Sequence, residues 1–170
     1  MPKFLRKVKY KTNWDPNGEF SKYVPAGEAP ADALQDLVTS DNALSLWEID
    51  DHGTNLERVL AAIASRGDHL QKIDYLIVDS KHIQGLGLRM EQRVGETHDS
   101  HANKSWHFDL NRLSASDLSR LANSMFANGK TERKVESSLI PLLKKSIEDG
   151  FVDKTNLRPN LLERIFKNQS

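Results

Sequence analysis

The sequence contains no cysteine, which excludes disulfide bonds, thiolate metal ligands, cysteine nucleophiles and iron–sulfur clusters. It also has no net charge, because 24 lysines and arginines balance 24 aspartates and glutamates. A uniformly charged partner, such as bulk nucleic acid or an anionic membrane, would therefore need a local patch. No uncharged apolar run approaches the roughly 18 residues of a membrane span, and none follows the basic start as in a signal peptide. We expect a soluble, cytoplasmic protein without a membrane partner.

What the chain does contain is enough apolar sequence for one core. Leu, Ile, Val and Phe occupy about a quarter of its positions, above the roughly 20% below which disorder becomes the default. The length of 170 residues suits one domain, and no internal repeat or low-complexity segment is present. We predict a single domain over 1–170, with a sheet layer in 1–112 and a helical tail in 113–170 packed on it.

The first half of the chain has the patterns of strands and one crossover helix. Strand-forming residues over Ala43–Ile49 precede a helical stripe that ends at Gly67, and Ile73–Val78 is nearly all apolar. These segments predict a strand, helix, strand unit with two neighbouring parallel strands and a right-handed connection.

A hairpin is predicted by strict two-residue alternation over 86–94 and again over 105–110, with 95–103 as its loop. If Val94 faces Lys104, then Glu91 faces His107 and Arg89 faces Asp109, which would create two complementary pairs on the polar face. The polar face of this hairpin, with its loop, is the candidate binding surface. It consists of Arg89, Glu91, Arg93, His107 and Asp109.

After Ser114 the apolar spacing becomes helical. Helices are predicted over 114–128, over about 130–150 and over 159–166, and Pro141 predicts a kink or restart near Ser138. The fold class is therefore α+β: a mixed sheet of about five strands with one βαβ crossover, followed by about three helices. The first two helices also resemble a helix-turn-helix arrangement, with Lys130, Arg133 and Lys134 at the start of the second.

Acidic residues follow the two strands that are expected to be parallel. Asp50 and Asp51 come after the first, and Asp79 and His82 after the second. Ligands of parallel sheets tend to bind beyond the carboxyl ends of the strands, where such acids could hold magnesium. A metal-dependent phosphoesterase or nuclease is the corresponding hypothesis. The alternative is that these aspartates serve local turns and helix starts.

Histidines are concentrated in and beside the hairpin loop. His98, His101 and His107 lie within ten residues, and neutral imidazoles are suitable zinc ligands. Their spacing matches no established zinc motif, so a hydrated loop is the competing interpretation.

The basic start of the chain suggests a second kind of partner. Lys3, Lys7, Lys9 and Lys11 occur without an acid before Thr12, and they could follow a phosphate backbone. Lysines on the outer face of an edge strand also deter aggregation, which requires no ligand.

A Pro- and Gly-rich connection over 13–30 carries Trp14, Phe20 and Tyr23 and leads to a short predicted helix near 30–39. Its aromatics could dock a protein or cover the sheet as a lid. Because no strong catalytic motif is present, the leading hypothesis is a non-catalytic protein–protein interaction module that needs no cofactor. It could be an accessory or inhibitory subunit of a bacterial-type system.

Overall fold

The computed structural model describes residues 1–167, and its strands form one six-stranded sheet in the order β4, β5, β2, β1, β3, β6. The strands are β1 (Lys3–Val8), β2 (Leu44–Ile49), β3 (Ile73–Asp79), β4 (Arg89–Gln92), β5 (His107–Asn111) and β6 (Lys130–Lys134). The predicted α+β class is confirmed. The details differ, since the sheet has six strands and every neighbouring pair is antiparallel.

Strand β1 lies in the middle of the sheet, between β2 and β3. β2 and β3 run in the same direction because each is antiparallel to β1. They were predicted to be neighbours, and that prediction is wrong because β1 lies between them. Phe4 and Leu5 are buried on opposite faces, at 2% and 0% exposure, so β1 is covered on both sides. The interpretation of its alternating lysines as the face of an edge strand is wrong.

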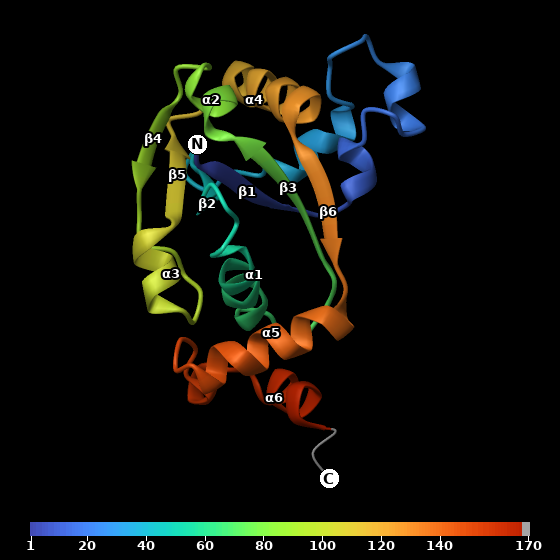
Figure 1. Ribbon diagram of the computed structural model, residues 1–170. Coiled ribbons are helices and arrows are strands. Elements are labelled where there is room, and N and C mark those ends of the chain that lie inside the picture. Colours follow the sequence, from blue (N-terminus) through green and yellow to red (C-terminus); the bar gives the residue numbers. More distant parts are fainter. Residues whose placement is uncertain (168–170) are drawn as a thin grey trace.

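Helices cover both faces of the sheet, as Figure 1 shows, with α2 and α4 on one side and α1, α5 and α6 on the other. The helices are α1 (Leu56–Ser65), α2 (Ser80–Gln84), α3 (Ser100–Ser105), α4 (Ala115–Asn128), α5 (Glu136–Glu148) and α6 (Pro159–Phe166). Leu5, Trp47 and Tyr75 pack in the core under α1 and α5. Phe4, Leu46 and Leu76 pack in the second core, under α4. Sheet alternation thus divides the apolar residues between two cores.

The predicted hairpin is present, but its register differs by two residues. Glu91 pairs with Asp109 and Arg89 with Asn111, instead of Glu91 with His107 and Arg89 with Asp109. The reason is that the connection is ordered: helix α3 occupies 100–105, and Trp106 ends that helix instead of starting the strand. A shift of two residues preserves side-chain parity, so the polar residues remain on one face.

The C-terminal part is not purely helical. Ser114 and Asp117 form the predicted capping box of α4, and α5 begins at Glu136 with Pro141 inside it. Between these helices, β6 pairs with β3 at the edge of the sheet, with Arg133 opposite Asp74. The helix-turn-helix hypothesis is therefore wrong. Its basic residues belong to an edge strand, where lysines discourage pairing with other chains.

The connection before β2 contains three 3-10 helices: η1 (Lys11–Trp14), η2 (Phe20–Tyr23) and η3 (Ala31–Asp36). The last of them lies within the short helix predicted near 30–39, and the first two lie in the segment predicted to be irregular. Trp14 is fully buried, and its indole N–H donates to Asp36 over 2.8 Å. Phe20 and Tyr23 remain exposed at 47% and 80%. Figure 1 shows this segment standing out from the body, so its outer part does not cover the sheet as a lid. A fourth 3-10 helix, η4 (Lys154–Asn156), connects α5 and α6. Within residues 1–167, no helix has the length and apolar character needed to cross a bilayer.

Candidate binding groove

A concave groove of about 1590 Å³ runs over the half of one sheet face that α1 and α5 leave open. Its floor is formed by β1, β2, β4 and β5. One wall is the C-terminal end of α1 with the loop that follows, and the opposite wall is the segment after η3. Eight cationic and seven acidic side chains of the described residues line it, so both charge signs are present in nearly equal number.

All five candidate binding residues of the hairpin line this groove. They are Arg89, Glu91, Arg93, His107 and Asp109. Alternation along β4 and β5 places them on the groove side, while Met90, Phe108 and Leu110 point to the core under α4. The tertiary structure therefore brings the set together.

Glu91 and Asp109 are directly opposite each other on neighbouring strands, which places two carboxylates side by side. Each has its own partners. Glu91 forms an ion pair with Arg89 and accepts a hydrogen bond from Asn111 over 3.1 Å. Asp109 accepts from the hydroxyl of Ser45 over 3.0 Å. The repulsion expected between like charges in facing positions is thus partly offset by fixed donors.

His107 is a buried member of the floor, with 7% exposure. Its Nδ1 lies 3.0 Å from the carbonyl oxygen of Arg93, and its Nε2 lies 3.9 Å from Asp109 Oδ1. The ring packs edge-on against Trp47, with 4.9 Å between centroids. Because its ring is buried and contacts Arg93, Asp109 and Trp47, His107 is a fixed part of the floor.

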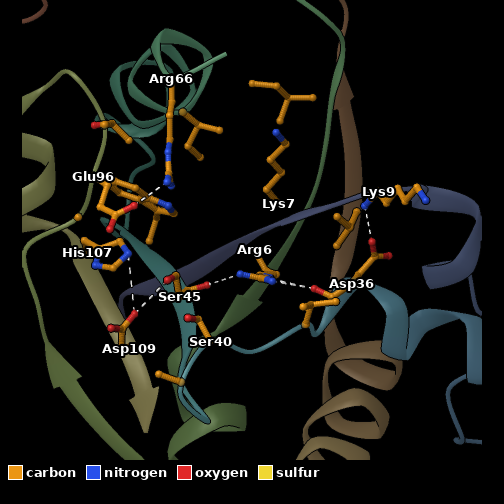
Figure 2. Close-up of a pocket in the computed structure, with 18 of the residues that line it drawn as sticks. Arg6, Lys7, Lys9, Asp36, Ser40, Ser45, Arg66, Glu96, His107 and Asp109 are labelled. Atoms are coloured by element: carbon orange, nitrogen blue, oxygen red, sulfur yellow. Dashed lines mark hydrogen bonds and ion pairs between the residues drawn. The ribbon is translucent and has the colours of Figure 1, made fainter. Parts of the chain in front are cut away.

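Arg6 sits where β1 and β2 separate. The pairing of the two strands runs from Lys3 and Ile49 to Leu5 and Trp47. Beyond that point the Arg6 guanidinium donates to the Ser45 carbonyl oxygen over 2.9 Å. It also donates twice to the carbonyl oxygen of Asp36, over 3.1 and 2.8 Å. Burial lowers the pKa of Arg6, and the charge of Asp36 opposes that shift. The guanidinium thus satisfies carbonyl oxygens of Ser45 and Asp36 at the point where the strand pairing ends (Figure 2).

Lys7 points into the groove from β1, with no interaction drawn to it in Figure 2. Burial is the largest cause that lowers its pKa, and the positive charges of Arg6 and Arg66 lower it further. Arg66, on the α1 wall, is paired with Glu96 from the loop after β4 over 2.5 Å. The Lys7 side chain is exposed by its accessible surface, so solvent still reaches its ammonium.

The strand-end acids do not form one site. Asp50 accepts hydrogen bonds from the backbone N–H groups of His52, Thr54 and Asn55 and from the Thr54 hydroxyl, and these bonds lower its pKa to about 2. Asp51 pairs with the amino group of Met1. Asp50 thus serves a local turn, which was the alternative interpretation from the sequence, while Asp51 is engaged by the Met1 amino group.

Asp79 and His82 lie on the other side of β1. Lys3 is the register partner of both Ile49 and Asp79, so one strand separates the ends of β2 and β3. Two strand spacings amount to roughly 10 Å. The expected convergence of Asp50, Asp51, Asp79 and His82 required neighbouring parallel strands, and the insertion of β1 removes that condition.

The three histidines proposed as zinc ligands are also kept apart. His101 packs against Trp106 with a centroid distance of 5.1 Å, while His98 donates its backbone N–H to Ser65. Across residues 1–167, no three His, Asp or Glu side chains are arranged to hold a metal ion. The predicted loop is in fact organised by Asp99, which caps α3 and binds Arg58.

The fold separates the four lysines of the basic chain start. Lys7 and Lys9 line the groove, while Lys3 and Lys11 do not. The sequence predicts Lys7 as a phosphate contact or as an outward lysine of an edge strand, and it does not single out Ser45, Arg66 or Glu96. Parity could have placed Lys7 and Leu5 on one face, but nothing local indicates that α1 stops short of Lys7.

No protein-family model, curated protein or solved structure matches this chain, so the candidate site rests on its own geometry.

Proposed function

We propose that the protein is a non-catalytic protein–protein interaction module, and that its contact surface is the groove over β4, β5, β2 and β1. The observation that carries the proposal is the convergence of Arg89, Glu91, Arg93, His107 and Asp109 on one groove. An accessory or inhibitory subunit is the form that such a module would take. The cytoplasm remains the expected compartment, on the sequence alone.

The size of the groove favours a polypeptide. Small-molecule sites usually occupy about 300–1000 Å³ and enclose their ligand. This groove measures about 1590 Å³, which suits an extended chain segment better than a metabolite. Val38 and Val94 stand at its rims with 71% and 67% exposure and offer apolar contacts beside the polar floor.

The charge pattern favours a protein over a nucleic acid. A phosphate backbone requires a surplus of cations along its path. Here seven acidic side chains accompany eight cationic ones, and Glu91 and Asp109 lie side by side on the part of the floor formed by β4 and β5. Backbone phosphates would approach these carboxylates directly, whereas a polypeptide can present both charge signs.

The metal-dependent enzyme is the weaker proposal, because Asp50 and Asp51 already have local partners. Thermal unfolding with millimolar magnesium, manganese or zinc tests it. A bound ion would stabilise the folded protein by mass action, so a clear rise in Tm would favour the enzyme.

Photo-crosslinking tests the interaction module. A photoreactive phenylalanine analogue is placed at Val94, on the groove rim, and in a control variant at Val135. Val135 is also an exposed valine, but it lies outside the groove. We expect a defined polypeptide adduct from position 94 and none from position 135.

A charge-reversal pair then tests specificity. Arg89→Glu with Arg93→Glu changes two exposed groove cations, and Arg120→Glu with Arg158→Glu changes two exposed cations elsewhere. We expect the adduct to disappear only in the groove variant. Equal adducts from positions 94 and 135, or an adduct with nucleic acid alone, would contradict the proposal.

A further inference from the structure

Strand β4 forms one edge of the sheet, and its outer side is open. Within residues 1–167, β5 is the only strand that pairs with β4. Figure 1 shows β4 on the outside of the molecule, beyond β5. The side chain of Gln92 donates to the carbonyl oxygens of Lys104 and Ser105, just before β5, so it does not cover the outer edge. An open edge of this kind can pair with a strand of another chain.

The hydrogen bonds to β5 determine which backbone groups of β4 point outward. The amide of Arg93 donates to the carbonyl oxygen of His107 over 3.2 Å, so Arg93 bonds inward. In an antiparallel pair, inward bonding recurs at every second residue, which assigns Arg89 and Glu91 to the inner side. The outward N–H and C=O groups then belong to Leu88, Met90 and Gln92.

These outward groups restrict how a second copy of the chain can pair with β4. Two identical antiparallel strands are related by a two-fold axis, and an axis through one residue of an outward-bonding edge must pass through an outward residue. Arg89 and Glu91 bond inward, so neither of them can face its own equivalent. With the axis at Met90, Arg89 instead faces Glu91 of the second copy, and Glu91 faces Arg89 of the second copy.

The axis at Met90 is the one that matches the extent of the strand, because its pairing stays within one residue of β4 (Arg89–Gln92). An axis at Leu88 would require Gly87, whose φ of +68° is not that of a strand. An axis at Gln92 would carry the pairing as far as Gly95, beyond the end of β4.

Both faces of the pairing centred on Met90 are complementary. On the groove face, Arg89 already pairs with Glu91 of its own chain, so the four charges of two copies alternate around the axis. Such a network is more favourable than one exposed ion pair. On the other face, the half-buried Met90 meets its own equivalent, next to Leu88 at the border of the core under α4.

The opposite edge of the sheet does not share this complementarity. Strand β6 (Lys130–Lys134) has three cations and one acid, so two copies of β6 would repel each other. Its one acid, Glu132, is also held by the Tyr75 hydroxyl and by Lys130. The β6 edge is therefore a comparison site within the same molecule.

We propose that this chain forms a two-fold symmetric homodimer in which β4 pairs antiparallel with β4 of a second copy, centred on Met90. The two sheets become one continuous sheet. The axis of such a pair is perpendicular to the sheet, so both grooves open on the same side, next to each other. The dimer is independent of the proposed function, because it requires no partner other than the chain itself.

Sedimentation equilibrium of the purified full chain, from about 1 µM to about 1 mM, tests the dimer. We expect dimers to predominate at the upper end. Arg89→Glu should weaken dimerisation about tenfold or more, because it places two acids opposite each other on both sides of the axis. Arg93→Glu is the matched control. It makes the same charge change on the same strand, but position 93 faces Gly87 of the second copy, and dimerisation should stay within about threefold of wild type.

A mixture of two variants tests the register without relying on loss of binding. Neither Arg89→Glu nor Glu91→Arg should form dimers alone, since each places like charges opposite each other. In an equimolar mixture, two acidic positions of one chain face two basic positions of the other. We expect the mixture to dimerise at least as tightly as wild type.

Hydrogen exchange on the unsubstituted chain provides a measurement that needs no variant. The amides of Leu88, Met90 and Gln92 should exchange about threefold or more slowly at 1 mM than at 10 µM, because the dimer bonds them. The amides of Thr131 and Arg133, which lie between the β6 residues bonded to β3, should exchange at the same rate at both concentrations.

Three results would overturn the proposed dimer. The first is a wild-type chain that remains monomeric at 1 mM. The second is equal weakening by Arg89→Glu and Arg93→Glu, or a mixture of Arg89→Glu and Glu91→Arg that stays monomeric. The third is concentration-dependent protection at Thr131 and Arg133 in place of Met90. None of these results bears on the crosslink from position 94, so the groove would remain a candidate contact surface.

Discussion

Arg58 on α1 and Asp99 before α3 form a two-point ion pair, with Nε–Oδ2 and Nη2–Oδ1 distances of 2.6 and 3.0 Å. Asp99 is completely buried, and the Arg58 guanidinium also lies over the rings of Trp106 and Phe151, at 5.4 and 3.4 Å from their centroids. Arg58 therefore connects the loop between β4 and β5, and the segment after α5, to helix α1.

We expect Asp99→Ala to lower the free energy of unfolding by about 3 kcal/mol, because it leaves Arg58 without its partner and removes the cap of α3. The exposed pair of Arg66, at the C-terminal end of α1, and Glu96, in the loop after β4, is the control, and Glu96→Ala should cost less than about 1 kcal/mol. Urea unfolding measures both. Equal losses in the two variants would refute the structural importance of the buried pair.

Asp109→Asn should increase the stability of the protein by about 0.5 kcal/mol in low salt. The amide oxygen can still accept from Ser45, while the repulsion from Glu91 on the facing strand disappears. The gain should diminish only in part in 1 M salt, because both carboxylates are half-buried and salt screens such charges less than exposed ones. A loss of stability in low salt would mean that the two carboxylates do not repel each other.

Asp74 predicts a dependence of stability on acid pH. The hydrogen bonds from Arg133 are the main cause that holds the pKa of Asp74 below its unfolded value of 3.8. Its stabilising contribution is therefore complete above pH 3.8 and is lost as pH falls from 3.8 toward the lower folded pKa. Urea unfolding between pH 2 and 5 should show a smaller acid loss in Asp74→Asn than in wild type. Parallel pH profiles would contradict this assignment.

Thr54→Val should raise the pKa of Asp50 from about 2 toward 3.8, because the Thr54 hydroxyl is the largest cause of its depression. Carboxyl ¹³C NMR during a pH titration measures this change in the folded protein. Asp153 is an internal control, since Thr155 lowers its pKa in a similar turn far from the substitution. An unchanged Asp50 titration would show that another interaction holds the carboxylate.

Alternation in the hairpin predicted which of its side chains share a face. Glu91 and Asp109 lie on the polar face because the side-chain period of a strand is two residues, and this remains true under the observed two-residue shift. Their mutual register was not predictable in the same way. It depends on α3, whose cap, Asp99, is stabilised by Arg58 from another part of the chain.

The amino-acid sequence alone determined the α+β class, the helical period after Ser114 and the separation of polar from apolar faces in β4 and β5, because these follow from local periodicity. The tertiary structure decided that β1 enters the middle of the sheet, which separates Asp50 from Asp79 and places Lys7 in the groove. Strand order depends on contacts between segments distant in sequence, and local sequence patterns do not indicate which strands become neighbours.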